Sequence, residues 1–251
     1  MAPFLYYERV ELPTDKKDEA PQSGTAGGLN SMRDETASAA PAGANEEIFN
    51  WGAVAMHARE AEAVNVKRTP VTVAVVDSGV EDTHPDLEGR VDTSRSVKCS
   101  VNGVATQDFY GWRDEFYHGT HVAGPIAAKH DGVGVDGVNP TLRIAAINVA
   151  SRNGGFFYPE YIVCGFVWAA EHGISVTNGS YYVDPWKYWL PNDLEQAAGQ
   201  EAVQRAVDYA TLKDVINVVA AGNFSTDLDN LPTTDDSAPG GPSRGEKAVP
   251  C

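Results

Sequence analysis

The sequence predicts an α/β fold with a mostly parallel β-sheet and helices on both of its faces. Short apolar, β-branched segments alternate along the chain with longer amphipathic segments, which is the pattern of repeated β-α-β units. The chain has 251 residues, of which 42% are hydrophobic, so it is long enough for one domain with a large core. In sheets of this kind, functional side chains gather at the carboxyl ends of the strands.

The regular elements are expected from about residue 50 onward. Residues 50–64 (NWGAVAMHAREAEAV) suggest a short helix, and residues 69–77 (TPVTVAVVD) predict a strand that is buried on both faces. The next strands are expected at residues 143–150 (RIAAINVA), 174–180 (ISVTNGS) and 215–223 (VINVVAAGN), the last also apolar enough to be buried.

Two longer helices are expected between these strands. In residues 160–173 the apolar side chains that share one helix face are Ile162, Phe166, Ala169 and Ala170, and Gly173 then ends the helix. In residues 194–214 the corresponding face consists of Val203, Ala206, Val207 and Ala210.

The two ends of the chain have a different composition. Residues 1–46 mix charges with Pro, Gly, Ser, Ala and Thr and show no sustained apolar period, which predicts a disordered or pro-segment-like tail. Residues 225–251 are rich in Pro, Gly, Asp and Ser and are expected to form a loop.

Charge and hydropathy exclude several classes of partner. There are 19 basic and 35 acidic residues, and the net charge of -16 argues against nucleic acid, which is bound by clustered Lys and Arg. No stretch approaches the about 18 consecutive apolar residues that a membrane span needs, so no membrane association is expected. The first residues also lack the basic start and apolar run of a signal peptide.

The three cysteines, Cys99, Cys164 and Cys251, cannot all pair with one another. Either they are free and partly buried, or a partner cysteine lies outside this sequence.

Three motifs could carry chemistry. Asp77 closes the first strand, HGTHVAG occupies residues 118–124, and AAGN occupies residues 220–223. Taken alone, each has an ordinary structural interpretation, because Asp and Asn are common in turns and caps. His118 and His121, three residues apart, could be metal ligands, or one of them a base with a packed neighbour.

The combination of motifs resembles the subtilase family of serine peptidases. The segments DSGV (77–80), HPDL (84–87), HGTHVAG and AAGN carry this resemblance in that order, and it covers roughly residues 50–225. It implies that Asp77 is the acid of a catalytic triad, His118 the general base and Asn223 the oxyanion-hole donor. His121 then has a structural role. Residues 47–251 are expected to be the N-terminal part of a secreted, subtilisin-like serine endopeptidase domain that cleaves extended polypeptides.

The resemblance also implies a substrate-binding strand. In TNGSYY, residues 177–182, the expected substrate contacts are Ser180, Tyr181 and Tyr182. The two tyrosines replace a smaller Leu-Gly pattern and could reshape the specificity pocket. The alternative is an ordinary strand with exposed tyrosines.

A structural Ca²⁺ site is implied by the loop KHDGVGV, residues 129–135, together with the HPDL segment. Hard oxygen ligands on a glycine-containing loop suit this ion. The expected ligands are Asp86, Lys129, Asp131, Val133 and Val135, with an ordinary turn as the alternative.

Two departures from the family pattern affect the expected function. Pro125 directly follows the HGTHVAG motif and is expected to kink or shorten the helix, since an interior proline costs about 3 kcal/mol. No Gly-Thr-Ser segment follows Asn223; the serine is expected roughly 160 residues after the base, beyond Cys251. The chain alone is therefore expected to be inactive.

Two other functions compete with this interpretation. One is a non-catalytic subtilase-like module that binds peptides or calcium. The other is a zinc hydrolase that uses His118 and His121, although no third ligand with metal spacing is apparent.

Overall fold

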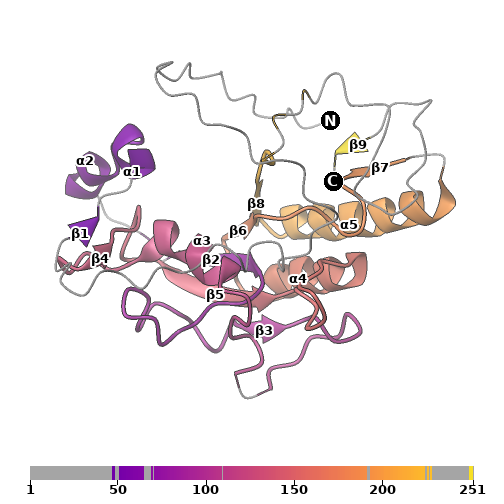
Figure 1. Ribbon diagram of the computed structural model, residues 1–251, viewed down its shortest axis with the longest axis horizontal. Helices are drawn as coiled ribbons and strands as arrows, with labels where there is room; N and C mark the ends of the chain where they lie inside the picture. Colours follow the sequence, from indigo (N-terminus) through magenta and orange to yellow (C-terminus); the bar gives the residue numbers. More distant parts are fainter. Residues whose placement is uncertain are drawn as a thin grey trace.

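The computed structural model describes residues 47–48, 51–64, 69, 71–108, 110–190, 193–223, 225, 227 and 249–250. The expected tail at residues 1–46 lies outside them. The helices are α1 (Trp51–Ala55), α2 (Ala58–Ala63), α3 (His118–Ala127), α4 (Pro159–Glu171) and α5 (Leu194–Leu212). The strands are β1 (Glu47–Ile48), β2 (Thr72–Asp77), β3 (Val97–Lys98), β4 (Gly134–Val135), β5 (Arg143–Asn148), β6 (Val176–Gly179), β7 (Tyr188–Trp189), β8 (Ile216–Val219) and β9 (Val249–Pro250) (Figure 1).

Five of the strands form one parallel sheet in the order β3-β5-β2-β6-β8. Strand β2 is central: it pairs with β5 from Thr72↔Arg143 to Asp77↔Asn148, and with β6 on its other side. Because all five strands run the same way, their carboxyl ends meet at one edge of the sheet. Two small two-stranded sheets, β1-β4 and β7-β9, lie outside it.

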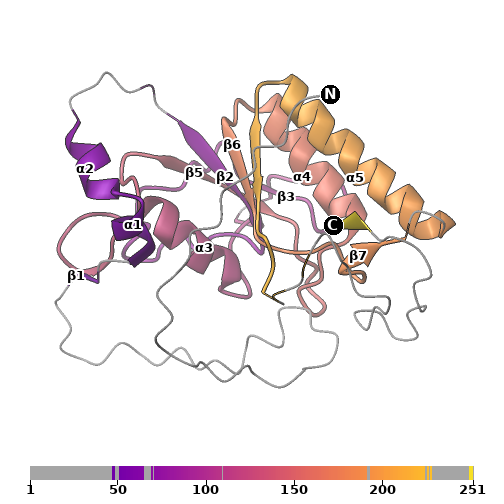
Figure 2. The same ribbon diagram turned by 90° about the horizontal axis from the view of Figure 1, so that it is seen from above.

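Helices cover both faces of the sheet, as expected (Figure 2). Alternate residues of β2 point to opposite faces: Val73 and Val75 pack in the core on the α3 side, and Ala74 and Val76 pack on the α4 side. All four side chains are at least 93% buried, which confirms the expected strand with two buried faces. The α/β fold class is therefore confirmed.

The expected helices α4 and α5 lie side by side on one face of the sheet (Figure 1). On the apolar face expected in α4, the side chains of Ile162, Phe166 and Ala169 are buried in the core. Ala170 is partly buried and packs at the margin of the core. Gly173 follows the end of α4 and has φ +65°. Glycine adopts this left-handed conformation at little cost, so it is a common residue at the end of a helix. Helix α5 starts at Asp193, whose side chain accepts hydrogen bonds from the backbone N–H groups of Glu195 and Gln196.

Strand β8 differs from the sequence-based expectation, because it is not buried. Ile216, Val218 and Val219 are 64%, 46% and 68% exposed. Apolar composition predicted a buried strand, whereas β8 lies at the edge of the five-stranded sheet and pairs only with β6 among the described strands. Within the described part of the chain, no other strand covers its outer edge.

Helix α3 is not ended by its proline. It continues through Pro125 to Ala127, so the expected shortening at that residue is wrong. The carbonyl of Pro125 accepts a hydrogen bond from the N–H of Val138, and that of Ile126 from Asn139. The chain after α3 therefore satisfies carbonyl groups that have no partner at the helix end.

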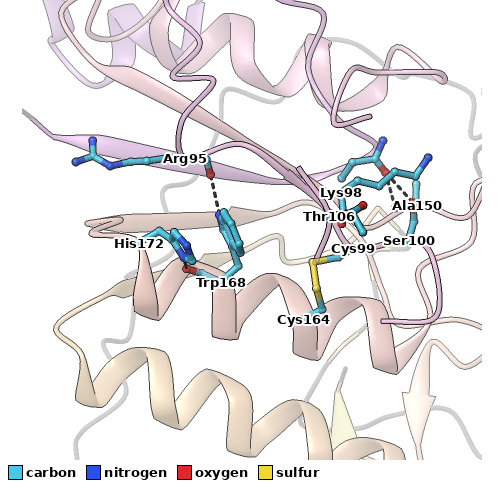
Figure 3. Close-up of a disulfide and its surroundings, with 10 residues drawn as sticks. Arg95, Lys98, Cys99, Ser100, Thr106, Ala150, Cys164, Trp168 and His172 are labelled. Atoms are coloured by element: carbon cyan, nitrogen blue, oxygen red, sulfur yellow. Dashed lines mark hydrogen bonds between the residues drawn. A yellow bond between two sulfur atoms is a disulfide. The ribbon is translucent and has the colours of Figure 1, made fainter. Parts of the chain in front are cut away.

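A disulfide joins Cys99, which directly follows β3, to Cys164 in α4 (Figure 3). The two Cα atoms are 5.8 Å apart, although 65 residues separate them in sequence. For Cys99 and Cys164, the expectations of free thiols and of a partner outside the chain are therefore wrong; neither expectation is tested for Cys251. Cysteine spacing does not reveal which helix covers β3; the sheet order decides that. Cys251 lies outside the described residues.

Within the residues that the structure describes, no helix is both long enough and apolar enough to cross a membrane.

Candidate active site

The candidate acid, Asp77, is the last residue of the central strand β2 and is completely buried. Its Oδ1 accepts hydrogen bonds from the N–H of Ser78 at 2.7 Å and from His118. Its Oδ2 is buried and has no hydrogen-bond partner among the described residues. Burial raises the pKa of Asp77 above its ordinary value, and the hydrogen bond from His118 opposes that change.

The candidate base, His118, is the first residue of α3, and its Nδ1 lies 2.7 Å from Oδ1 of Asp77. A carboxylate only accepts hydrogen bonds, so Nδ1 carries the proton and Nε2 of the neutral ring has a free lone pair. No described side chain hydrogen-bonds to Nε2. The bond to Asp77 is the main cause that raises the pKa of His118, and the charges of Asp77 and Asp114 add to it.

Two glycines allow α3 to approach the end of β2. Gly79 has φ +106°, in the region where only glycine is free of strain. A β-carbon on Gly119 would overlap the carbonyl oxygen of Gly79 and lie 3.1 Å from Cβ of Asp77. These contacts bring two residues 41 positions apart in sequence into hydrogen-bonding distance.

The second histidine of the motif, His121, is exposed and forms no hydrogen bond or ion pair with Asp77. The described residues contain no group of three or more His, Cys, Asp or Glu side chains that could hold a metal ion. The two histidines of α3 therefore do not come together with a third such ligand in the described part of the chain.

The expected substrate residues follow β6 directly. Ser180 accepts a hydrogen bond from the side-chain amide of Asn178 at 3.0 Å. The ring of Tyr181 stacks on Phe157, with a centroid distance of 4.7 Å, and is not an exposed side chain. Burial and the charge of Asp77 both raise the pKa of Tyr181, which places this phenol within electrostatic reach of the candidate acid. Tyr182, like Ser180 and Tyr181, is half-buried.

Asn223 lies four residues after the end of β8, on the same edge of the sheet as Asp77. Its side chain is exposed. The structure thus brings Asp77 and His118 into contact, whereas no contact joins Asn223 to either of them among the described residues.

The expected calcium ligands come from two segments that pack together. Asp86 accepts a hydrogen bond at its Oδ2 from the N–H of Val135, at 3.1 Å, and its backbone carbonyl accepts one from the N–H of Lys129, at 2.9 Å. Asp131 accepts one from the N–H of Val133 at 3.3 Å and lies 3.5 Å from the ammonium of Lys129. A β-carbon at Gly134 would lie 2.5 Å from both carboxylate oxygens of Asp86.

One residue of the site was not foreseen from the sequence. Asp114, four residues before His118, accepts hydrogen bonds from the backbone N–H groups of Tyr117 and Thr120, which lie on either side of His118 in the sequence. An acidic side chain shortly before a helix start is a known capping signal and could have identified it.

The chain is similar to known proteins in sequence and in fold. Residues 68–246 match the model of the subtilase family. Fervidolysin of Fervidobacterium pennivorans is 36% identical over 190 residues, which covers 72% of this chain and 25% of fervidolysin. Subtilisin E of Bacillus subtilis is 33% identical over 171 residues, covering 68% of this chain and 38% of the relative. The chain therefore spans well under half the length of these two proteins.

Two solved structures share the fold. The nisin leader peptidase of Lactococcus lactis has a TM-score of 0.56 and 25% identity, covering 68% of this chain and 49% of that one. The epidermin leader peptide processing serine protease of Staphylococcus aureus has a TM-score of 0.55 and 26% identity, covering 65% and 40%. The chain belongs to the subtilase family, the subtilisin-like S8 peptidases.

Proposed function

We propose that this chain supplies the acid and the base of a serine endopeptidase site. Asp77 orients the imidazole of His118 and stabilises its positive charge, and His118 removes the proton of a serine hydroxyl through Nε2. The observation that carries this proposal is the 2.7 Å hydrogen bond between Nδ1 of His118 and the buried Oδ1 of Asp77. It leaves Nε2 as the basic atom.

We further propose that the nucleophile is not among the serines of this sequence and that the 251-residue chain alone does not hydrolyse peptides. Ser78, the serine next to Asp77, donates its hydroxyl to Asp114 and is not directed at His118. No other described serine hydrogen-bonds to the ring of His118. Without a positioned hydroxyl, no acyl-enzyme can form.

The substrate in this proposal is an extended polypeptide. Ser180, Tyr181 and Tyr182 continue β6 beyond the sheet edge at which Asp77 lies, so a peptide could pair with this segment. Asn223, at the same edge, would donate to the developing oxyanion. Two of the structural relatives are named as leader peptide processing enzymes, which supports a polypeptide substrate.

A secreted location is part of the same proposal. The Cys99–Cys164 disulfide supports it, because disulfides form and persist in oxidising compartments and are rare in the cytosol.

We also propose that Asp86 and the loop at residues 129–135 hold a structural Ca²⁺ ion. Only two ligands of the expected set are carboxylates, those of Asp86 and Asp131, and the others are backbone carbonyls. Gly132 and Gly134, with φ of +85° and +72°, adopt left-handed conformations that allow the loop to turn tightly at little cost. The ion would tie this loop to the HPDL segment and add no step to the chemistry.

A serine-directed fluorophosphonate probe tests the main proposal. The purified chain should show neither labelling nor casein hydrolysis, whereas subtilisin E, as a positive control, should show both. Stoichiometric labelling of a serine in this chain, with turnover abolished by the label, would place the nucleophile within these 251 residues. If the chain hydrolyses casein only in the presence of zinc and no serine is labelled, the result would favour the metal hydrolase instead.

A further inference from the structure

We infer that Asp114 is a positioning residue, which holds the first turn of α3 against the turn after β2 so that Nδ1 of His118 meets Oδ1 of Asp77. This inference rests on the proposed role of His118 as the base. Asp114 forms no hydrogen bond with the imidazole, and it would act through the backbone on both sides of it.

The carboxylate of Asp114 is the acceptor of five hydrogen bonds, which is an unusually large number for one side chain. Its Oδ1 accepts from the N–H groups of Phe116 and Tyr117, both at 2.9 Å, and from the hydroxyl of Ser78 at 2.8 Å. Its Oδ2 accepts from the N–H of Thr120 at 2.8 Å and from the hydroxyl of Thr120 at 2.6 Å.

These donors surround the candidate base in sequence and in space. Tyr117 immediately precedes His118, and Thr120 follows it by two residues, so both ends of this short segment are tied to one carboxylate. The N-terminal N–H groups of a helix have no partners within the helix, and Asp114 satisfies two of them at the start of α3. Tyr117 also has φ +66°, a conformation that costs free energy in a residue with a side chain.

Ser78 extends the network to the candidate acid. Its hydroxyl donates to Asp114 and accepts the N–H of Gly119 at 2.9 Å, while its own N–H donates to Asp77. A continuous chain of hydrogen bonds therefore runs from Asp77 through Ser78 to Asp114 and back to the residues that flank His118. A second link fastens the same segments, since the N–H of Glu81 donates to the hydroxyl of Thr120 at 3.0 Å.

Asp114 also contributes charge to the pair. Its carboxylate raises the pKa of His118 and that of Asp77, as expected for a second negative charge near the site. The other charge that acts on the ring is that of Asp77 at the end of β2, and the phenol of Tyr181 after β6 lies within electrostatic reach of Asp77. The neighbouring Arg113 is paired with Asp82 and Glu81 and belongs to a separate ion-pair group.

The experiment measures the pKa of His118 by NMR titration of the isotope-labelled imidazole in the 251-residue chain. Asp114→Asn removes the charge and leaves a side chain of the same size that can accept hydrogen bonds at one oxygen only. We expect the pKa of His118 to fall by about one unit, roughly a tenfold change in the protonation equilibrium. Glu115→Gln is the matched control: it removes a charge from the adjacent, exposed residue and should leave the pKa close to that of the wild type.

Asp114→Glu separates position from charge. The longer side chain keeps the negative charge but cannot place both oxygens on the same five donors, so a positioning residue is not rescued and the pKa should fall again. A wild-type pKa in Asp114→Glu would show that Asp114 acts through charge alone. An unchanged pKa in a folded Asp114→Asn variant would show a purely structural role, and either result overturns the inference.

Two further variants keep the result interpretable. Ser78→Ala removes the hydroxyl that bridges Asp114 and Gly119, so it should lower the pKa of His118 in the same direction even if Asp114→Asn does not fold. An unchanged pKa there would count against the inference. Asp77→Asn tests the proposed function separately: if it leaves the pKa of His118 unchanged, the Asp77–His118 pair itself is wrong, whatever Asp114 does.

Discussion

Gly119 packs against Gly79 so closely that no side chain fits between α3 and the turn after β2. A β-carbon on Gly119 would overlap the carbonyl oxygen of Gly79 and press on the side chain of Asp77. This contact between two glycines sets how near the base can come to the acid. It explains why the chain has a glycine directly after His118, within the first turn of a helix, where glycine is otherwise unfavourable.

Gly119→Ala should therefore separate α3 from β2. We expect a loss of about 1–3 kcal/mol in the free energy of unfolding, as for other overpacked sites, and a lower pKa of His118 as its bond to Asp77 weakens. Urea denaturation and NMR titration measure the two effects. Gly124→Ala in the same helix is the control, because its β-carbon would have only Val135 Cγ2, at 3.8 Å, nearby. That variant should be neutral or more stable by up to about 1 kcal/mol, and equal losses from both variants would contradict the explanation.

Loss of the disulfide should destabilise the fold without touching the site. Replacing Cys99 and Cys164 by alanine removes a cross-link that closes a loop of about 65 residues, which contains His118. For a loop of this length we expect a loss of about 4 kcal/mol, seen as a lower urea midpoint. Reduction of the wild-type chain should reproduce this shift and have no effect on the double variant. Thiol titration that finds Cys99 and Cys164 free in the unfolded, non-reduced chain would contradict the prediction.

Asp184 should make the stability of the chain depend on pH between about 4 and 6. It is 4% exposed, accepts the N–H of Phe157 at 2.7 Å, and burial raises its pKa to about 6. A raised pKa means that the folded state holds the proton more tightly than the unfolded state, whose carboxyl titrates near its ordinary value. The stabilisation is thus complete below pH of about 4 and is lost as the pH rises through about 6, by roughly 2–3 kcal/mol.

Asp184→Asn cannot titrate and should remove this part of the pH dependence. The measurement is the free energy of unfolding by urea at several pH values, with the variant compared at each pH to the wild type. Asp208→Asn, which changes an exposed carboxylate on α5, should leave a curve parallel to that of the wild type. If the Asp184→Asn curve is parallel as well, the carboxyl of Asp184 is not the titrating group.

Calcium should raise the melting temperature of the chain through the loop at residues 129–135. A ligand that binds only the folded state adds about 2.7 kcal/mol at a hundredfold excess over its Kd. Differential scanning calorimetry with millimolar Ca²⁺ and with chelator measures the shift. Asp131→Ala should abolish it, whereas Glu88→Gln, a change at an exposed neighbour of Lys129, should retain it. A melting temperature that Ca²⁺ and chelator leave unchanged in the wild type would remove the proposed site.

The sequence by itself determined four strands of the main sheet, the two long helices, and the sheet edge at which the candidate site lies. The apolar runs at residues 72–77 and 143–148 have the length and composition of strands buried on both faces, and they become β2 and β5. The spacing of apolar residues in α4 predicted its buried face, because side chains that recur every three to four residues lie on one side of a helix. The resemblance of the motifs to the subtilase family predicted Asp77 and His118 as partners, and the structure places them in hydrogen-bonding contact.

Only the tertiary structure decided which residues meet. The sheet order places β8 at an edge and β3 beneath α4, so an apolar strand is exposed and two cysteines 65 residues apart are bonded. The hydrogen bond from Ser78 to Asp114 likewise arises from the way in which α3 docks on the turn after β2, whereas the other four bonds of Asp114 come from residues within six positions of it. The physical reason is that periodicity reports the faces of each element, whereas pairing between parallel strands and contacts between docked segments join residues far apart in sequence, and no local pattern encodes them.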